Sequence, residues 1–318
     1  MRILVTGAAG FVGRAVVGNL QARGDRVLAV VRERSRATHV EALGAELVED
    51  DLSSAERLAE WLTGADAVVH VAGSYRVGIL KSERAAMWDA NVGTTTRVLS
   101  AAKRARTPRV VYVSTVNAFG NTRGKIVDEA YRRDLADGFL SWYDETKYRA
   151  HEIVEQAIAA GSPVVVALPS QVYGPADHSA VGEQLRRAFD GTLRYRALDD
   201  VGIGLVHVED LAAGILAVLD RGVIGRSYIL SGPTTTLRSA IELAAGVGGR
   251  QSPRVRVPTS VLRAMAPLGS AIGQPNLGEV ISASDGVTYW ASAKRANEDL
   301  GWTPRSIQVG LRDTFRGA

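Results

Sequence analysis

The sequence contains no cysteine among its 318 residues. This absence excludes disulfide bonds, thiolate metal sites and a cysteine nucleophile, and it fits a protein of a reducing cytoplasm. No stretch approaches the roughly 20 apolar residues needed to cross a bilayer, so we expect no membrane partner. The first residues enter a strand pattern at once and leave no room for a signal peptide, which again predicts a cytoplasmic protein.

Blocks of one charge are also scarce. The 38 Lys and Arg residues nearly balance the 34 Asp and Glu residues, giving a net charge of +4, and they are interspersed with acids except at Arg32, Arg34 and Arg36. We therefore expect no nucleic-acid partner and no metal site. The hydrophobic fraction of 46% is typical of an ordinary globular protein. The chain is long enough for one large domain or two fused ones.

Short apolar runs alternate with longer amphipathic segments through the first half of the chain. Several runs are apolar almost throughout, as in strands buried on both faces of a parallel sheet. The expected strands are 3–6, 26–31, 45–48, 67–71, 109–114 and 163–168. The expected helices between them are 11–23, 53–62, 82–104 and 142–159. This alternation predicts a doubly wound, parallel α/β sheet of the Rossmann type.

A glycine-rich turn with the sequence TGAAGFVG lies between the first expected strand and the first expected helix. Gly7 allows a tight turn, Gly10 lets a pyrophosphate approach the backbone, and Gly13 lets the helix pack closely on the sheet. The helix opens at Phe11 and Val12, where free N–H groups and the positive dipole end favour phosphate. This context predicts dinucleotide binding, although small residues also occur in purely structural turns.

After Pro169 the pattern changes to turn formers and short helical segments. A strand, helix and strand return across 204–230. Further helical segments are expected at 182–189, 237–247, 259–265 and 293–300. We predict a dinucleotide-binding domain over 1–168, to which part of 204–230 returns, and a smaller C-terminal substrate-binding lobe over 169–318.

Arg32 ends the second expected strand, where NAD-binding proteins carry an acidic residue for the ribose hydroxyls. A guanidinium suits a 2′-phosphate instead, and Arg34 and Ser35 stand beside it, so we predict NADP(H) as cofactor in preference to NAD(H). The alternative is a set of solvated loop charges, which the neighbouring Glu33 favours.

Asp51 and Leu52 lie just past the third expected strand, where they are placed to meet the adenine ring. The alternative is that this segment forms the N-cap of the next helix, near Ser53. The sequence leaves both interpretations open.

Tyr143 and Lys147 are four residues apart, on one face of an expected helix. A phenol with a pKa near 10 is a poor acid-base catalyst at neutral pH, and a nearby ammonium favours its ionised form. Thr115 follows an expected parallel strand, at the sheet edge where such folds bind ligands, and its hydroxyl could hold a substrate oxygen beside Tyr143. Alternatively, Thr115 belongs to a simple strand-end turn.

The chain resembles the extended short-chain dehydrogenase/reductase superfamily, also called the NAD-dependent epimerase/dehydratase family. The matching motifs, in order, are TGAAGFVG at 6–13, DDL at 50–52, VVHVAG at 68–73, NVGT at 91–94, VYVSTVNAFG at 111–120, YDETK at 143–147, PSQVYGP at 169–175, HVEDLA at 207–212 and LGWTP at 300–304. They cover essentially the whole chain.

The resemblance implies that Thr115 is the catalytic Ser/Thr and Tyr143 the general acid/base. It implies that Lys147 lowers the pKa of the tyrosine and holds the nicotinamide ribose. Further cofactor contacts are implied along two segments, Val71, Ala72 and Gly73, and Pro169, Ser170 and Val172. One departure is Leu168, where many relatives carry arginine, so the anchoring of this loop differs.

Three features favour one branch of the superfamily. Sugar-nucleotide dehydratases resemble one another in having an acidic residue directly after the catalytic Ser/Thr, but here Val116 and Asn117 follow Thr115. Epimerases typically carry an acidic residue at the end of the second strand, and here that residue is Arg32. The run GVTYWASAKRANEDLGWTP resembles dihydroflavonol-reductase-like and hydroxysteroid-dehydrogenase-like members. We predict NADP(H)-dependent reduction of a ketone or aldehyde, or the reverse oxidation, by hydride transfer with Tyr143 as general acid/base. The alternatives are an NAD-dependent nucleotide-sugar epimerase and a non-catalytic NADP-sensing protein.

We expect the small carbonyl or alcohol substrate to bind between the loops 74–80, 117–119 and 173–178 and the second lobe. The expected helices 82–104 and 142–159 resemble the pair through which many relatives dimerise. The sequence therefore predicts a homodimer.

Overall fold

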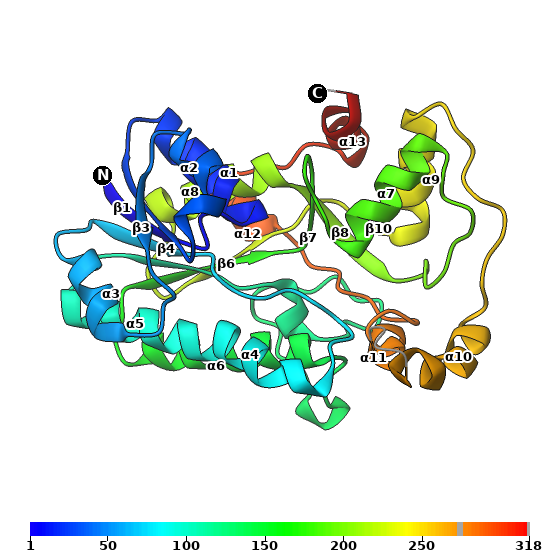
Figure 1. Ribbon diagram of the computed structural model, residues 1–318, viewed down its shortest axis with the longest axis horizontal. Helices are drawn as coiled ribbons and strands as arrows, with labels where there is room; N and C mark the ends of the chain where they lie inside the picture. Colours follow the sequence, from blue (N-terminus) through cyan, green and yellow to red (C-terminus); the bar gives the residue numbers. More distant parts are fainter. Residues whose placement is uncertain (272–275, 317–318) are drawn as a thin grey trace.

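The computed structural model describes residues 1–271 and 276–316, and it contains a seven-stranded parallel sheet (Figure 1). The strand order is β3-β2-β1-β4-β5-β6-β9. The strands are β1 (Arg2–Thr6), β2 (Arg26–Val31), β3 (Glu46–Glu49), β4 (Ala67–His70), β5 (Val110–Val113), β6 (Val164–Pro169) and β9 (Ser227–Leu230). The order reverses between β1 and β4, so the carboxyl ends of these two strands flank the crevice where doubly wound sheets bind ligands. The predicted fold class is confirmed.

Helices cover both faces of this sheet (Figure 1). One layer contains α3 (Ala55–Leu62), α5 (Thr94–Ala105) and α6 (Trp142–Ala159), and the other contains α1 (Phe11–Ala22), α2 (Thr38–Glu41), α8 (Val208–Arg221) and α12 (Lys294–Leu300). Successive strand residues face opposite sides. In β6, for example, Val164 and Val166 join the core beneath one layer, and Val165 joins the core beneath the other.

The helix predicted over 82–104 is present but irregular. The chain there makes a 3₁₀ turn (Lys81–Glu83), α4 (Arg84–Trp88), a π-helical turn (Asp89–Gly93) and then α5. The π turn inserts extra residues into the helix, which rotates the buried Asn91 toward the loop after β4. Its hydrogen bonds to that loop are tertiary contacts, which helical periodicity does not report.

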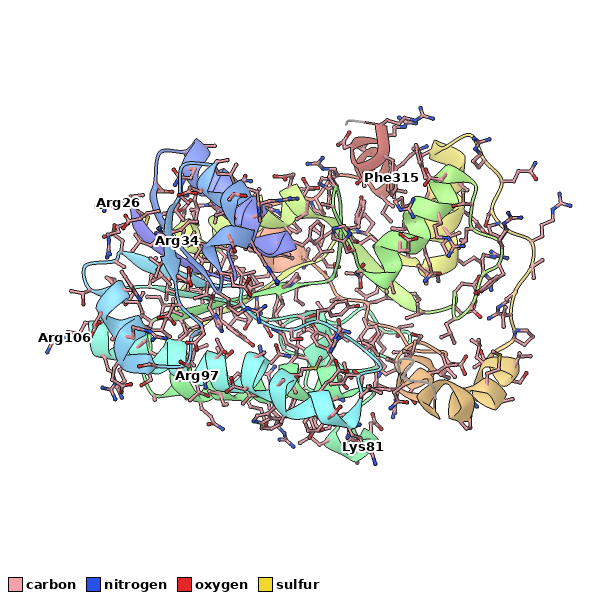
Figure 2. The ribbon with its side chains drawn as sticks, viewed as in Figure 1. Arg26, Arg34, Lys81, Arg97, Arg106 and Phe315 are labelled. Atoms are coloured by element: carbon pink, nitrogen blue, oxygen red, sulfur yellow. The ribbon has the colours of Figure 1, made fainter. Side chains whose placement is uncertain are left out.

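The second lobe is built on a three-stranded sheet in the order β10-β8-β7, with β7 (Gln171–Tyr173), β8 (Gly202–His207) and β10 (Thr234–Thr236). Its helices are α7 (Ala180–Asp190), α9 (Leu237–Val247), α10 (Thr259–Ala271), α11 (Leu277–Ser282) and α13 (Ile307–Arg316). Figure 2 shows Phe315 of α13 turned toward α7, where its ring stacks on Phe189 with centroids 4.9 Å apart.

The chain crosses between the two parts more than once. Within 204–230, β8 belongs to the small sheet, whereas α8 and β9 lie with the main sheet. Near the C-terminus, Trp302 is buried in the core beneath α8 and its indole N–H donates to the Asp210 carbonyl oxygen at 2.8 Å. This end of the predicted substrate lobe therefore packs on the dinucleotide-binding part.

In the described part of the chain, no helix is long and apolar enough to cross a membrane. The same residues contain no group of three or more acidic or histidine side chains arranged to hold a metal ion.

Candidate active site

The glycine-rich turn joins β1 to α1 at the crevice between β1 and β4. Gly7 has a φ of +69°, and a Cβ there would lie 2.7 Å from the Ala72 Cα. A Cβ on Gly13 would overlap the Gly7 carbonyl oxygen. Gly10 is the N-cap of α1 and supplies no side-chain cap, and the first turn carries no acid. This tight cradle and uncapped positive helix end fit the pyrophosphate of a dinucleotide.

The segment after β4 runs from this turn toward Lys147. Val71 donates its N–H to the Thr6 carbonyl oxygen at 3.3 Å, and Ala72 donates to the Thr6 Oγ1 at 3.2 Å. A Cβ on Gly73 would lie 4.0 Å from the Lys147 Nζ. The structure therefore brings three predicted cofactor residues and the predicted catalytic lysine to one side of the crevice.

Arg32, at the end of β2, is exposed and has no hydrogen bond or ion pair within the described ranges. The other two arginines of this cluster have partners. Arg34 lies at the sheet edge (Figure 2) and donates to the Leu47 carbonyl oxygen at 2.6 Å. Arg36 pairs with Glu33 at 2.9 Å. Arg32 is thus the arginine of the cluster left available for an anionic ligand.

Asp51 is exposed, and its carboxylate accepts the Ser53 main-chain N–H at 3.0 Å and pairs with Arg57 at 2.8 Å. The N-cap of α3 is Ser54, whose Oγ accepts the Arg57 N–H at 3.2 Å. Asp51 is therefore not the helix cap. Leu52 is buried in the core with a φ of +61°. The predicted contact of this pair with adenine stays a prediction.

Thr115, Tyr143 and Lys147 are all buried, with exposed fractions of 6%, 7% and 8%. Tyr143 and Lys147 lie one turn apart on α6, which has the predicted bounds and is capped by Ser141. Thr115 follows β5 and caps a short 3₁₀ turn, where its Oγ1 accepts the Asn117 N–H at 3.2 Å. The sheet edge and the helix thus bring the three predicted catalytic residues together.

Burial governs the electrostatics of this group. It raises the pKa of the Tyr143 hydroxyl above its ordinary value, and the nearby Tyr75 adds to this, whereas a hydrogen bond with Thr115 lowers the pKa. Burial lowers the pKa of the Lys147 ammonium to about 8. The Lys147 Nζ lies 3.4 Å from the Val113 carbonyl oxygen, to which it donates. Desolvation of the phenol is thus the largest cause of the Tyr143 shift, and the expected lowering of its pKa by Lys147 stays a prediction.

Two residues of the site were not named individually by the sequence analysis. Asn91, in the π turn, accepts the Ser74 N–H at 2.7 Å, donates to the Ser74 carbonyl oxygen at 3.1 Å and donates to the Thr146 Oγ1 at 2.9 Å. The Tyr75 ring meets the Tyr143 ring edge-on. The NVGT motif offered a signal for Asn91, but no pattern in the sequence singles out Tyr75.

The predicted nicotinamide loop leaves β6 at Pro169. Ser170 is buried, and its Oγ has no hydrogen-bond partner among the described residues, which leaves a hydroxyl for a bound group. Val172 lies in β7. Leu168 is buried in the core opposite Ile229 of β9, so apolar packing holds the start of this loop.

A family model, described as the NAD dependent epimerase/dehydratase family, matches residues 3–231. The chain belongs to the NAD-dependent epimerase/dehydratase family. The predicted resemblance is thereby confirmed, and the protein is an oxidoreductase of the extended short-chain dehydrogenase type, a family that binds nicotinamide nucleotides.

Its relatives include several reductases. A putative dihydroflavonol 4-reductase of Synechocystis sp. is 30% identical, over 97% of this chain and 92% of the relative. A 4-hydroxy-2-methyl-3-oxo-4-farnesyl-3,4-dihydroquinoline-1-oxide ketoreductase of Stigmatella aurantiaca is 34% identical, over 86% of this chain and 80% of the relative. A dTDP-glucose 4,6-dehydratase of Mycobacterium tuberculosis is 28% identical over 76% of this chain and 77% of the relative, so family membership alone does not select the reaction.

Solved structures support the same family. The crystal structure of gox2253 is 30% identical, with a TM-score of 0.85 over 99% of this chain and 96% of that one. A double mutant of the dTDP-glucose 4,6-dehydratase DesIV from Streptomyces venezuelae, with NAD bound, is 26% identical. Its TM-score is 0.81 over 99% of this chain and 96% of that one.

Proposed function

We propose that this protein is an NADP(H)-dependent oxidoreductase that reduces a ketone or aldehyde to an alcohol, or catalyses the reverse oxidation. The main observation behind this proposal is the buried Tyr143 hydroxyl, which lies beside Thr115 with Lys147 one helical turn away. The names of the reductase relatives support the same reaction class.

In this proposal the hydroxyls of Tyr143 and Thr115 hold the carbonyl oxygen, and Tyr143 donates the proton that this oxygen receives. Burial favours the neutral phenol, so Tyr143 remains protonated at neutral pH, as carbonyl reduction requires. Lys147 is charged below a pH of about 8 and stabilises the phenolate that proton donation leaves behind. The bound dinucleotide supplies the hydride.

The residues around the crevice fit NADP(H). The proposed cofactor contacts are Gly7, Gly10, Phe11, Val12, Gly13, Arg32, Asp51, Leu52, Val71, Ala72, Gly73, Tyr143, Lys147, Pro169, Ser170 and Val172. Arg32 supports the choice of NADP(H), because an exposed guanidinium with no partner among the described residues suits a 2′-phosphate.

Dehydration and epimerisation have less support from the site. The catalytic Thr115 is followed by the buried Val116 and by Asn117, so no carboxylate stands there to remove water. Arg32 occupies the position where an epimerase typically carries an acid. Epimerisation by a retained NAD is nevertheless the second candidate, because the matching family model is described as epimerase/dehydratase.

We also propose that the substrate carries an apolar substituent. The loop beside Tyr143 contributes the half-exposed Tyr75, and its apolar Val77 and buried Ile79 belong to one cluster with Tyr143 and Trp142. Two relatives are named as a farnesyl-dihydroquinoline-oxide ketoreductase and a 2-alkyl-3-oxoalkanoate reductase, and both names indicate substrates with an apolar substituent.

A substrate panel tests the proposal. It contains short-chain and long-chain β-keto esters, aromatic aldehydes, UDP-glucose and dTDP-glucose, each with NADPH or NADH. We expect one alcohol formed for each NADPH consumed on a ketone or aldehyde. Interconversion of a nucleotide sugar with no added cofactor would contradict the proposal and favour the epimerase.

We propose a homodimer formed through α5 and α6, which lie side by side on the outer surface of one layer (Figure 1). Sedimentation at micromolar concentration tests this, and a monomer there would contradict it.

A further inference from the structure

Helix α11 of the second lobe reaches across to the catalytic part through the carboxylate of Glu279. One oxygen accepts the Gly78 N–H at 2.9 Å, and the other accepts the N–H of Trp142. Gly78 lies in the loop after β4, and Trp142 is the first residue of α6, directly before Tyr143. A single side chain therefore joins a wall of the expected substrate cleft to the start of the helix that carries the predicted catalytic pair.

The sequence at Gly78 is adapted to this contact. Its carbonyl oxygen accepts the N–H of Asn276, the N-cap of α11, at 2.6 Å. The start of α11 therefore binds both main-chain polar groups of Gly78. Gly78 has a φ of +81°, and a Cβ there would lie 2.8 Å from the Val280 Cγ2. Any larger residue at this position would therefore push the loop away from α11.

Glu279 also satisfies a group that the helix cannot satisfy itself. The first N–H groups of an α-helix have no partner within the helix. In α6, the Ser141 Oγ accepts the Asp144 N–H at 3.0 Å, and the Glu279 carboxylate accepts the Trp142 N–H. A carboxylate is favourable at this end because the helix dipole is positive there.

We propose that Glu279 is a positioning residue, which holds the loop 74–80 so that Tyr75 stays against Tyr143 and the carbonyl substrate binds productively. Its effect on substrate rests on the proposed reductase function. The same loop is anchored at its start by Asn91 and at its end by Glu83, whose carboxylate accepts the Leu80 N–H at 3.0 Å. Glu279 supplies the middle anchor from the second lobe.

Amide hydrogen exchange on the full chain tests the contact without a substrate. In Glu279→Ala, exchange at Gly78 and Trp142 should accelerate by about 10-fold or more, with a smaller effect in Glu279→Gln, which keeps one acceptor oxygen. The control is Glu298→Gln, which alters an exposed glutamate that pairs with Lys294 on α12 and should change neither amide. Unchanged exchange at both amides in both Glu279 variants would overturn the inference.

Steady-state kinetics with NADPH and the best β-keto ester of the panel tests the positioning role. Glu279→Gln should raise the KM for the ester by about 10-fold while the KM for NADPH stays within about 2-fold. A general loss of folding would change both constants and the melting temperature. Faster exchange with an unchanged ester KM would overturn the positioning role. If the wild type turns over nothing in the panel, the proposed function fails, and the exchange data still decide whether Glu279 holds the loop.

Discussion

The ring of Tyr75 stands edge-on against the ring of Tyr143, with centroids 4.9 Å apart and planes at 86°. Half of the Tyr75 surface is exposed, whereas Tyr143 is buried. Tyr75 therefore covers one side of the proposed catalytic phenol and leaves the rest of its surface accessible. Such aromatic pairs contribute about 0.5–1.5 kcal/mol beyond their buried area.

The first prediction concerns this ring. Tyr75→Ala should raise the KM for an apolar ketone by roughly 3- to 10-fold, because a wall of the cleft and the edge contact are both lost. The KM for NADPH should not change. Tyr75→Phe keeps the ring and should behave like the wild type, so an equal loss in the Phe variant would show that the hydroxyl matters instead.

The second prediction concerns pH. Burial lowers the pKa of Lys147 to about 8, so the ammonium loses its charge as the pH rises through that value. The phenolate that Tyr143 forms on donating its proton is then no longer stabilised by this charge. The kcat/KM for ketone reduction should fall above a pH of about 8. Lys147→Arg retains the charge, so its activity, although lower, should show no such alkaline fall. A profile that is identical in both proteins would refute this role of the charge.

The third prediction concerns the cofactor. Arg32→Ala should raise the KM for NADPH by about 10- to 100-fold, because a charged, bidentate contact with the 2′-phosphate is lost. The KM for NADH should change little. Arg36→Ala is the matched control, since Arg36 already pairs with Glu33. Equal effects of Arg32→Ala on both cofactors would exclude the proposed phosphate contact.

The fourth prediction concerns stability in acid. Burial lowers the pKa of His70 to about 3 and that of His151 to about 4, from an ordinary value of 6.5. Below pH 6.5 the unfolded chain therefore binds more protons than the folded one, so folding stability is complete above that pH and is lost as the pH falls toward 4. Each histidine contributes a slope of about 1.4 kcal/mol per pH unit.

Urea unfolding between pH 6.5 and 4 measures this slope. His151→Gln should make it shallower, whereas His39→Gln, at an exposed position, should leave it unchanged. Equal slopes in the wild type and His151→Gln would show that His151 does not carry this effect.

Local patterns predicted much of the fold. The bounds of α6 could be predicted from its helical pattern, and those of β2 from an almost unbroken apolar run. The helical segment over 82–104 could be predicted, but its π turn could not, because this turn is stabilised by tertiary contacts such as that of Asn91 with Ser74. An ion pair between Arg97 and Asp89 at 2.8 Å also spans the turn within the segment. Such contacts leave no periodic signal in the sequence.

The residues of the site also fall into those that the sequence could predict and those that it could not. Thr115, Tyr143 and Lys147 could be predicted because each follows a strand end or occupies one face of a helix. Tyr75 and Glu279 could not, because their importance depends on loops that meet only in the folded chain; Glu279 is 137 residues from Trp142 in sequence.

The most direct measurement of the central claim uses NADPH that carries deuterium at its transferable position, with the β-keto ester that reacts fastest. Mass spectrometry should find one deuterium on the carbinol carbon of the product. Tyr143→Phe should slow its appearance by about 100-fold or more while NADPH still binds. A product without deuterium, or a Tyr143→Phe variant as fast as the wild type, would contradict the account.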